Sequence, residues 1–478
     1  MTETVSEASL ILYIKERFHN TSDLFVETIE WQGESSIICY FSGLTESSTL
    51  NIQLEILRKR ADDGNPDWGE TGASTILPFS MSTMIDAVCA GSVAIIFPKN
   101  NRLLKITIPT ITVRSPDEPN NEFVVRGAHE GFVESNDKNI SLIRKHLAIP
   151  DLVVKDLRLG KVTNTKVTYV YIESIADKEV VEEVKSRLEN IDSPKIYSTG
   201  QIEDYLEDSV WSAFPQFLST ERPDRVVANL LGGKIVIFTD ESPTALIAPV
   251  TFFSFFESPD DFNGRVYIGT FFRFLRLFSF MIAIFLPAFY IAVVGFHSEI
   301  LPYAISKSVK IAVQDIPYPP IIEALIVEIF IELIREATVR LPAPIGPTIG
   351  IVGGLVIGDA IVNAGLVSNL MVIVVAMTAI SSHVIPNVEM NVTIRIIRYP
   401  FMFAASVFGF FGITILTLIL FIHVMNQSSL KQPYFSPVVP FDPSRLKNIF
   451  FRIPYYKNQK QQQTFTHGGS KKKDGGET

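Results

Sequence analysis

The chain has 478 residues, of which 47% are hydrophobic and 19% charged, and its formal net charge is −9. This length suffices for two or three domains, and an acidic chain without a basic stripe in its first half is not expected to bind nucleic acid. The two cysteines, Cys39 and Cys89, are too few for a disulfide framework. We therefore expect the first half to lie in a reducing compartment.

Charge divides the chain into two parts. Residues 1–264 contain 40 acidic and 24 basic residues, whereas residues 265–478 contain 11 acidic and 18 basic ones. The first part has the composition of an acidic soluble protein. The second is an apolar body with basic flanks, which suits a membrane domain facing anionic lipid. Residues 1–16 contain no apolar core, so a cleaved signal peptide is not expected.

Helical and strand patterns alternate through the first part, which is typical of an α/β fold. Lys166–Glu173 alternates between apolar and polar residues and predicts a strand, and Asp177–Asn190 predicts an amphipathic helix. Two segments, Gly91–Phe97 and Gly232–Phe238, are similar in sequence and form a weak internal repeat. In each, a helical stretch ends at a capping glycine and an apolar strand follows.

The repeat predicts two related α/β subdomains, residues 1–150 and 151–264, although helix, glycine and strand are also common neighbours by chance. No nucleophile–base pair, phosphate-binding loop or zinc-ligand spacing is visible, so we expect neither an enzyme nor a cofactor or metal. His129 could act as a catalytic base. A surface turn is the favoured interpretation, because its surroundings are glycine-rich and charged.

The second part predicts an all-α, multi-pass membrane domain over residues 265–425. Apolar runs predict spans near residues 277–296, 346–363, 369–386 and 400–425. Arg265, Arg273 and Arg276 precede the first span, and residues 426–478 form a basic tail that is expected to be partly disordered. By the positive-inside rule, both ends are expected in the cytoplasm.

The segment 319–340 is apolar but carries charged residues well before its end, namely Glu323, Glu328, Glu332, Arg335 and Glu336. On a helix the last four share roughly one third of the circumference, and Glu323 points the other way. Such charges are costly in lipid, so this face must meet water, protein or headgroups. The segment is therefore either an interfacial amphipathic helix, which we favour, or the lining of a polar path in an assembly.

Glycine recurs at every fourth position in the next apolar run, at Gly346, Gly350, Gly354 and Gly358. Small residues at this spacing allow membrane helices to approach closely, which predicts a helix-packing ridge. Asp359 lies beside the last glycine, and an acid within a membrane helix is a functional candidate. The alternatives are that Asp359 pairs with a base such as Arg395 or Arg398, or that it lies at the membrane surface.

Several segments resemble the A subunits of the GerA family of spore germination receptors. In the second part they are the stretch from Pro317–Leu325 through Gly358–Ala360, Ser381–Pro386 and Arg395–Pro400, and in the first part Val125–Glu134, Leu142–Ile149 and Ser254–Phe256. The resemblance extends from about residue 12 to residue 454. It departs from the family pattern at Ala128-His129, where a Pro-Arg pair is expected.

The resemblance implies a nutrient-sensing receptor in the inner spore membrane. Its A subunit would act with a membrane B subunit and a lipoprotein C subunit, and A subunits would form an oligomeric, nutrient-gated ion channel.

For such a channel the candidate groups of a pore or polar path are Glu323, Glu328, Glu332, Asp359 and Val362. Ile351 and Leu355 could join Val362 in an apolar constriction. A secondary transporter is the alternative, although no inverted repeat is visible.

Overall fold

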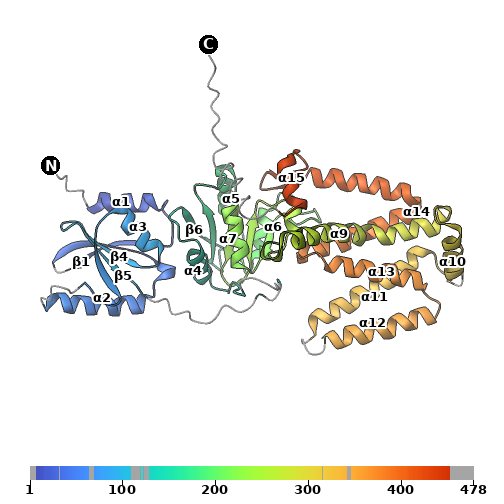
Figure 1. Cartoon of the computed structure of the whole chain (residues 1–478), viewed down its shortest axis with the longest axis horizontal. Helices are drawn as coiled ribbons and strands as arrows, with labels where there is room; N and C mark the ends of the chain where they lie inside the picture. Colours follow the sequence, from blue (N-terminus) through green and yellow to red (C-terminus); the bar gives the residue numbers. More distant parts are fainter. Residues whose placement is uncertain are drawn as a thin grey trace, which may run out of the picture.

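The structure is a computed structural model that describes residues 7–31, 33–63, 69–108, 119, 122, 129–314, 316–341 and 346–452. Two α/β units and a helical bundle follow one another along a single long axis (Figure 1). Residues 125–128 of one family-like segment and residues 453–478 of the basic tail lie outside the described residues.

The first unit is built on a five-stranded antiparallel sheet of order β1-β2-β4-β5-β3. Strand β4 is buried throughout, because helices α1 and α3 cover one face of the sheet and α2 covers the other. The elements are α1 (Glu7–Arg17), β1 (Leu24–Trp31), β2 (Glu34–Phe41), η1 (Ser42–Leu44), α2 (Ser47–Asp62), β3 (Ser74–Pro78), α3 (Met81–Cys89), β4 (Val93–Phe97) and β5 (Arg102–Ile106).

The second unit repeats this arrangement, with strand order β6-β7-β9-β10-β8. Helices α4 and α7 cover one face of its sheet, and α5 and α6 cover the other. The elements are α4 (Asn136–His146), β6 (Leu152–Leu159), β7 (Thr165–Ile172), α5 (Lys178–Glu189), α6 (Thr199–Leu206), β8 (Leu218–Thr220), α7 (Pro223–Leu231), β9 (Ile235–Thr239) and β10 (Ala245–Ala248).

The structure therefore confirms the predicted pair of α/β subdomains, and it adds that both sheets are antiparallel with the same strand order. The glycines that end α3 and α7 are Gly91 and Gly233, with φ of 79° and 83°. The second capping residue is thus Gly233, one position later than the sequence repeat suggested. The division near residue 150 remains a prediction, since α4 contacts both η1 of the first unit and α7 of the second.

A buried ion pair joins the two units. Arg144 of α4 is 2% exposed and donates from Nε and Nη2 to the two carboxylate oxygens of Asp23 at 2.8 and 2.9 Å. Its guanidinium carbon lies 4.1 Å from the centroid of the Phe41 ring. Nearby, the backbone N–H of Ser22 donates to the carbonyl of Val154. The planar guanidinium thus meets a carboxylate and an aromatic face of the first unit together.

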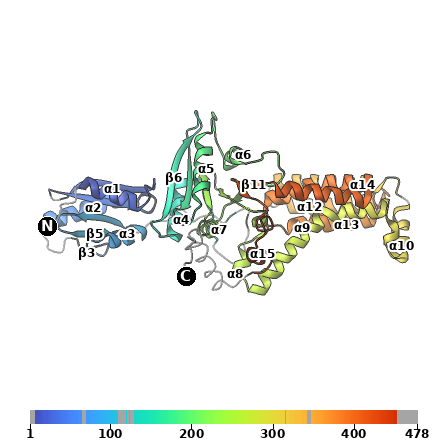
Figure 2. The same ribbon diagram turned by 90° about the horizontal axis from the view of Figure 1, so that it is seen from above.

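The helical part begins at a short neck and continues as a bundle of antiparallel helices (Figure 2). The neck contains η2 (Phe252–Phe256) and α8 (Asp260–Asn263). The bundle contains α9 (Val266–Gly295), η3 (Ser298–Ile300), α10 (Tyr303–Gln314), α11 (Pro320–Arg340), α12 (Gly346–Asn363), α13 (Asn369–His383) and α14 (Val388–Met425). The hairpin β11 (Ser428–Ser429) and β12 (Gln432–Pro433) and helix α15 (Pro443–Phe450) follow.

Helix α14 is a hairpin of two arms. Gly409 has φ of 57° and ψ of −138°, which interrupts the helix. Thr393 in the first arm donates to the carbonyl of Ala213, and His423 in the second arm contacts the neighbouring Ser212. Because residues thirty positions apart meet the same loop, the chain must reverse between them. The run expected as one span over residues 400–425 therefore includes a reversal that its apolar sequence conceals.

By length and composition, α9 is the one helix among the described residues that is long and apolar enough to cross a membrane. Helix α13 and the second arm of α14, Phe410–Met425, are apolar but shorter. The core of the second unit continues into the bundle through aromatic side chains. The Phe252 ring centroid lies 5.6 Å from that of Phe280 in α9 and 5.7 Å from that of Phe435.

The pair between the two units supplies a first prediction. Arg144→Ala leaves the Asp23 carboxylate, which is 11% exposed, without its charged partner, so we expect the free energy of unfolding to fall by about 3 kcal/mol. Lys161→Ala is the matched control, because Lys161 and Asp192 pair at 2.6 Å while remaining 72% and 75% exposed, and exposed pairs contribute less than about 1 kcal/mol. Denaturant unfolding measures both variants, and equal losses would contradict the assignment.

Candidate functional site

Two of the predicted acids form ion pairs with arginines of α14, and the first of these pairs is buried inside the bundle. Glu328 of α11 is 3% exposed, and Nη1 of Arg398 lies 2.7 and 2.6 Å from its two carboxylate oxygens. The Nε of Arg398 donates to the carbonyl of Ala283 at 2.9 Å. One guanidinium therefore connects α11, α14 and α9. A carboxylate held in this way is neutralised within its own subunit.

A second pair lies one turn further along α11, where Arg395 donates to Glu332. Arg335 lies 3.6 Å from the Glu332 carboxylate, and its Nη2 lies 3.2 Å from Nε2 of His383. The charged face of α11 is thus buried at Glu328 and half-exposed at Glu332, where both acids meet arginines of α14, and it is exposed at Glu336, which pairs with Arg340 of the same helix. The sequence predicted α11 to be either an interfacial helix or the lining of a polar path. It did not reveal that arginines of α14 pair with its acids.

Glu323 has a different environment. It is fully buried, and one carboxylate oxygen accepts the backbone N–H of Ser368 at 3.0 Å. Ser368 is the N-cap of α13, so the carboxylate lies at the positive end of that helix. The Ser368 hydroxyl lies 3.2 Å from that of Tyr290. The other carboxylate oxygen of Glu323 is buried without a hydrogen-bond partner among the described residues.

Asp359 lies on the outside of the subunit. Its carboxylate is exposed and accepts a hydrogen bond from Asn363 at 2.9 Å. The bases that could have paired with it, Arg395 and Arg398, are bound to the α11 acids instead. Ile351 and Leu355 are 72% and 74% exposed. Val362 is half-buried. These α12 positions fall on one side of the helix, within about 80° at 100° per residue.

The four glycines of the ridge have different neighbours along α12. A Cβ on Gly346 would lie 3.2 Å from the carbonyl oxygen of Thr338 in α11, and one on Gly350 would lie 3.8 Å from the Thr338 hydroxyl. Around Gly354 and Gly358 the corresponding space is open to 4 Å. A four-residue spacing advances about 40° per step on an α-helix, so the ridge turns from α11 toward the outer face.

The joint between the second unit and the bundle was missed by the sequence analysis, because its residues lie in separate elements. The loop that carries Ser212 contacts both arms of α14, and Tyr434 donates to the carbonyl of Pro215 at 2.8 Å. Beside this loop, burial and the nearby Glu389 of α14 raise the pKa of Glu203 to about 9. Burial and Asp204 raise the pKa of Glu207 to about 7. His129 is exposed in a segment without helix or strand.

The raised pKa values of Glu203 and Glu207 predict that low pH stabilises the joint. Both carboxyls have a usual pKa of 4.5, so their neutral forms favour folding below that value. This contribution is lost as pH rises through about 7 for Glu207 and about 9 for Glu203. We expect Tm to fall across this range, and Glu203→Gln to raise Tm by a few degrees at pH 9.

Thermal unfolding of the detergent-solubilised chain at several pH values measures this effect. Glu189→Gln, an exposed carboxyl on α5, is the control and should leave the pH profile unchanged. A Glu203→Gln profile that matches that of the unmodified chain would contradict the prediction.

Comparison with known proteins identifies the family. The family model described as the Bacillus/Clostridium GerA spore germination protein matches residues 12–464. Spore germination protein KA of Bacillus subtilis is 35% identical, covering 95% of this chain and 86% of that protein. Spore germination protein GerLA of Bacillus cereus is 37% identical, covering 92% of each. The membrane protein YfkQ of Bacillus subtilis is 39% identical, covering 84% of this chain and 78% of that protein.

Among solved structures, the N-terminal domain of the A subunit of the Bacillus megaterium spore germinant receptor GerK3 matches with 27% identity and a TM-score of 0.40. It covers 52% of this chain and 95% of that one. The family match spans nearly the whole chain, and its curated members align over both the α/β units and the bundle. The chain therefore belongs to the GerA family of spore germination proteins, as the non-enzymatic, membrane-associated A subunit of a germination receptor.

Proposed function

We propose that this A subunit crosses the inner spore membrane several times and assembles with copies of itself into a nutrient-gated ion channel. It would act beside a membrane B subunit and a lipoprotein C subunit. The observation that carries the proposal is the outer face of α12, which exposes an acid, Asp359, within an apolar helix. An exposed carboxylate is costly in hydrocarbon, so this face is expected to meet water or another subunit.

A ring of α12 helices would give a packing partner to the glycines of this face and a water-filled path to its acid. Gly354 and Gly358 leave room for a neighbouring backbone. Ile351, Leu355 and Val362 would then supply an apolar constriction, and Asp359 would supply a fixed negative charge that attracts cations. Glu328 and Glu332 are assigned a different role, because their pairing with Arg398 and Arg395 holds α11 against α14.

The places where the chain enters and leaves the bundle support the predicted topology. The start of α9 follows the second α/β unit through the neck, where Arg276 binds Asp261, and the end of α14 lies beside that unit, since Ser429 just after it binds the carbonyl of Gln216. An even number of crossings fits this placement. Arg265 is exposed at the start of α9 and favours a cytoplasmic side for both α/β units. A secondary transporter is less favoured, because the acids Glu328 and Glu332 within the subunit already have partners.

Substitutions at two positions of the glycine ridge should distinguish an effect on assembly from an effect on folding. Gly354→Leu adds a side chain to open space, so the subunit should fold normally while the complex fails to assemble, at a cost of about 1 kcal/mol or more per contact. Gly346→Leu is the matched control: it forces a side chain against the Thr338 carbonyl, so the subunit itself should be destabilised. Subunit yield and oligomer size, measured in detergent, distinguish the two. A normal oligomer and normal germination with Gly354→Leu would contradict the proposal that this part of the ridge packs against a neighbouring subunit.

Asp359→Asn tests conduction. The change keeps the shape of the side chain and removes its charge, so we expect an assembled complex with reduced cation flux or altered selectivity. Glu328→Gln is the control, since it leaves the buried Arg398 without a charged partner and should reduce the folded subunit by destabilising it about 3–5 kcal/mol.

Electrical recording of reconstituted complexes, read beside complex yield, measures both variants. Intact Asp359→Asn complexes with unchanged flux and selectivity would rule out the pore role of Asp359. Coupled, stoichiometric flux in place of passive currents would favour the transporter.

A further inference from the structure

Helix α15 lies across the end of the bundle that faces the second unit (Figure 1). It is held on the first turns of α9. The ring of Phe450 stacks on that of Phe274 with centroids 5.8 Å apart, and Arg273 donates to the carbonyl of Asn448 at 2.5 Å. The backbone N–H of Arg452 donates to the Thr270 hydroxyl at 3.2 Å. The inner face of α15 therefore packs on α9, which is long and apolar enough to cross a membrane.

The outer face of α15 is basic and has aromatic residues at both ends. Lys447 and Arg445 are exposed. Phe441 before the helix is 70% exposed, and Phe451 after it is 51% exposed while one side of its ring packs on Phe274. Asp442 caps the helix and lies 3.3 Å from Arg445, so it offsets part of that charge. Lys447 has no ion pair among the described residues.

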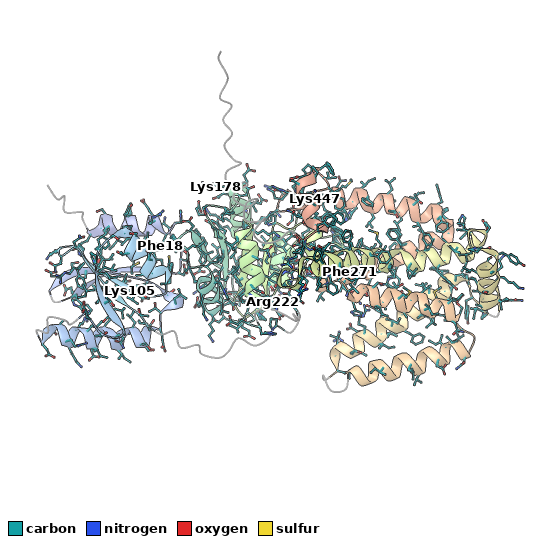
Figure 3. All side chains as sticks on the ribbon, viewed as in Figure 1. Phe18, Lys105, Lys178, Arg222, Phe271 and Lys447 are labelled. Carbon is teal, nitrogen blue, oxygen red and sulfur yellow. The ribbon has the colours of Figure 1, made fainter. Side chains whose placement is uncertain are left out.

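The same surface continues onto α9. Arg265, Tyr267 and Phe271 are exposed there, the two aromatic residues by 86% and 62%. Figure 3 labels Lys447 and Phe271, and both lie where the second unit meets the bundle. Exposed aromatic side chains beside Lys and Arg at the start of a membrane helix match the chemistry of the headgroup region, where the rings lie at the interface and the bases meet anionic lipid.

We propose that the outer face of α15 and the exposed first turns of α9 form a docking surface for anionic phospholipid headgroups. The proposal rests on the membrane crossing of α9 in the proposed function. Headgroups are present wherever a helix enters a bilayer, and the basic charge of this surface complements them. Through Arg273, which α15 contacts, headgroup binding would also fix the position of the neck, because Arg273 lies 3.6 Å from the buried Asp261.

A single introduced thiol can report on this surface. Cys39 and Cys89 are buried, and burial raises their pKa values to about 12 and about 11, so both native thiols should react slowly. Phe441→Cys places a label at the surface, and Phe451→Cys gives a second position if the first variant fails to fold. Leu12→Cys, on the 62% exposed Leu12 of α1 in the first unit, is the matched control.

The full chain carrying an environment-sensitive dye is placed in nanodiscs of phosphatidylcholine alone or with added phosphatidylglycerol, and quenching by acrylamide is measured, because this neutral quencher is not repelled by anionic lipid. We expect phosphatidylglycerol to shield the dye at residue 441 and not at residue 12, and added salt to reverse the shielding. Lys447→Gln should lower the ratio of shielded to unshielded dye about fivefold.

Shielding that does not change with lipid charge, with salt or with Lys447→Gln would indicate a protein contact or simple apolar burial and would overturn the proposal. Equal shielding of a dye at residue 12 would overturn it as well. Ion flux through the complete receptor in vesicles of the same lipids separates the two proposals. Flux without shielding overturns the docking surface alone, and shielding without flux overturns the channel alone.

Discussion

The buried ion pair between Arg398 and Glu328 is the interaction on which the arrangement of the bundle depends. A carboxylate that is 3% exposed within an apolar helix cannot remain charged there without a partner. Arg398 supplies that partner and also binds the carbonyl of Ala283, so a single side chain links α11, α14 and α9. Loss of the pair would weaken the contacts of all three helices at once.

The same device recurs at the other junctions of the molecule. Arg144 binds Asp23 between the two α/β units, and Arg276 binds Asp261 at the neck, where Asp261 is 1% exposed. Each guanidinium presents a planar set of donors that can satisfy a carboxylate and a neighbouring carbonyl together. Buried arginine–carboxylate contacts therefore hold three places where separate parts of this chain meet: the two α/β units, the neck and the bundle interior.

Local pattern was sufficient to predict much of the fold. The alternation in residues 166–173 corresponds to β7, and the repeat after Gly91 corresponds to equivalent strands in two sheets of the same order. The reversal at Gly409 was not predictable in this way, because phenylalanine flanks the glycine on both sides and the apolar run continues through the turn. Hydropathy measures burial, and it does not distinguish one long helix from two short antiparallel ones.

The candidate site was predicted as a set of residues but not as an arrangement. Glu323, Glu328, Glu332 and Asp359 all appear as acids in apolar segments, and sequence alone cannot separate them. Their partners distinguish them: two bind arginines of α14, Glu323 lies at the start of α13, and Asp359 faces outward. Partners that are sixty or more residues away are set by tertiary packing, which no local spacing records.

The double contact of the Ser212 loop with α14 has a mechanical consequence. A single contact would let the second unit pivot against the bundle about one point. Here the loop is tied to the first arm at Thr393 and to the second arm at His423, and the reversal at Gly409 connects those arms at their far end. Two attachments at adjacent loop residues restrict that motion to rotation about the line that joins them. Any other rotation of the α/β unit tilts the closed loop formed by the two arms and their turn as one lever.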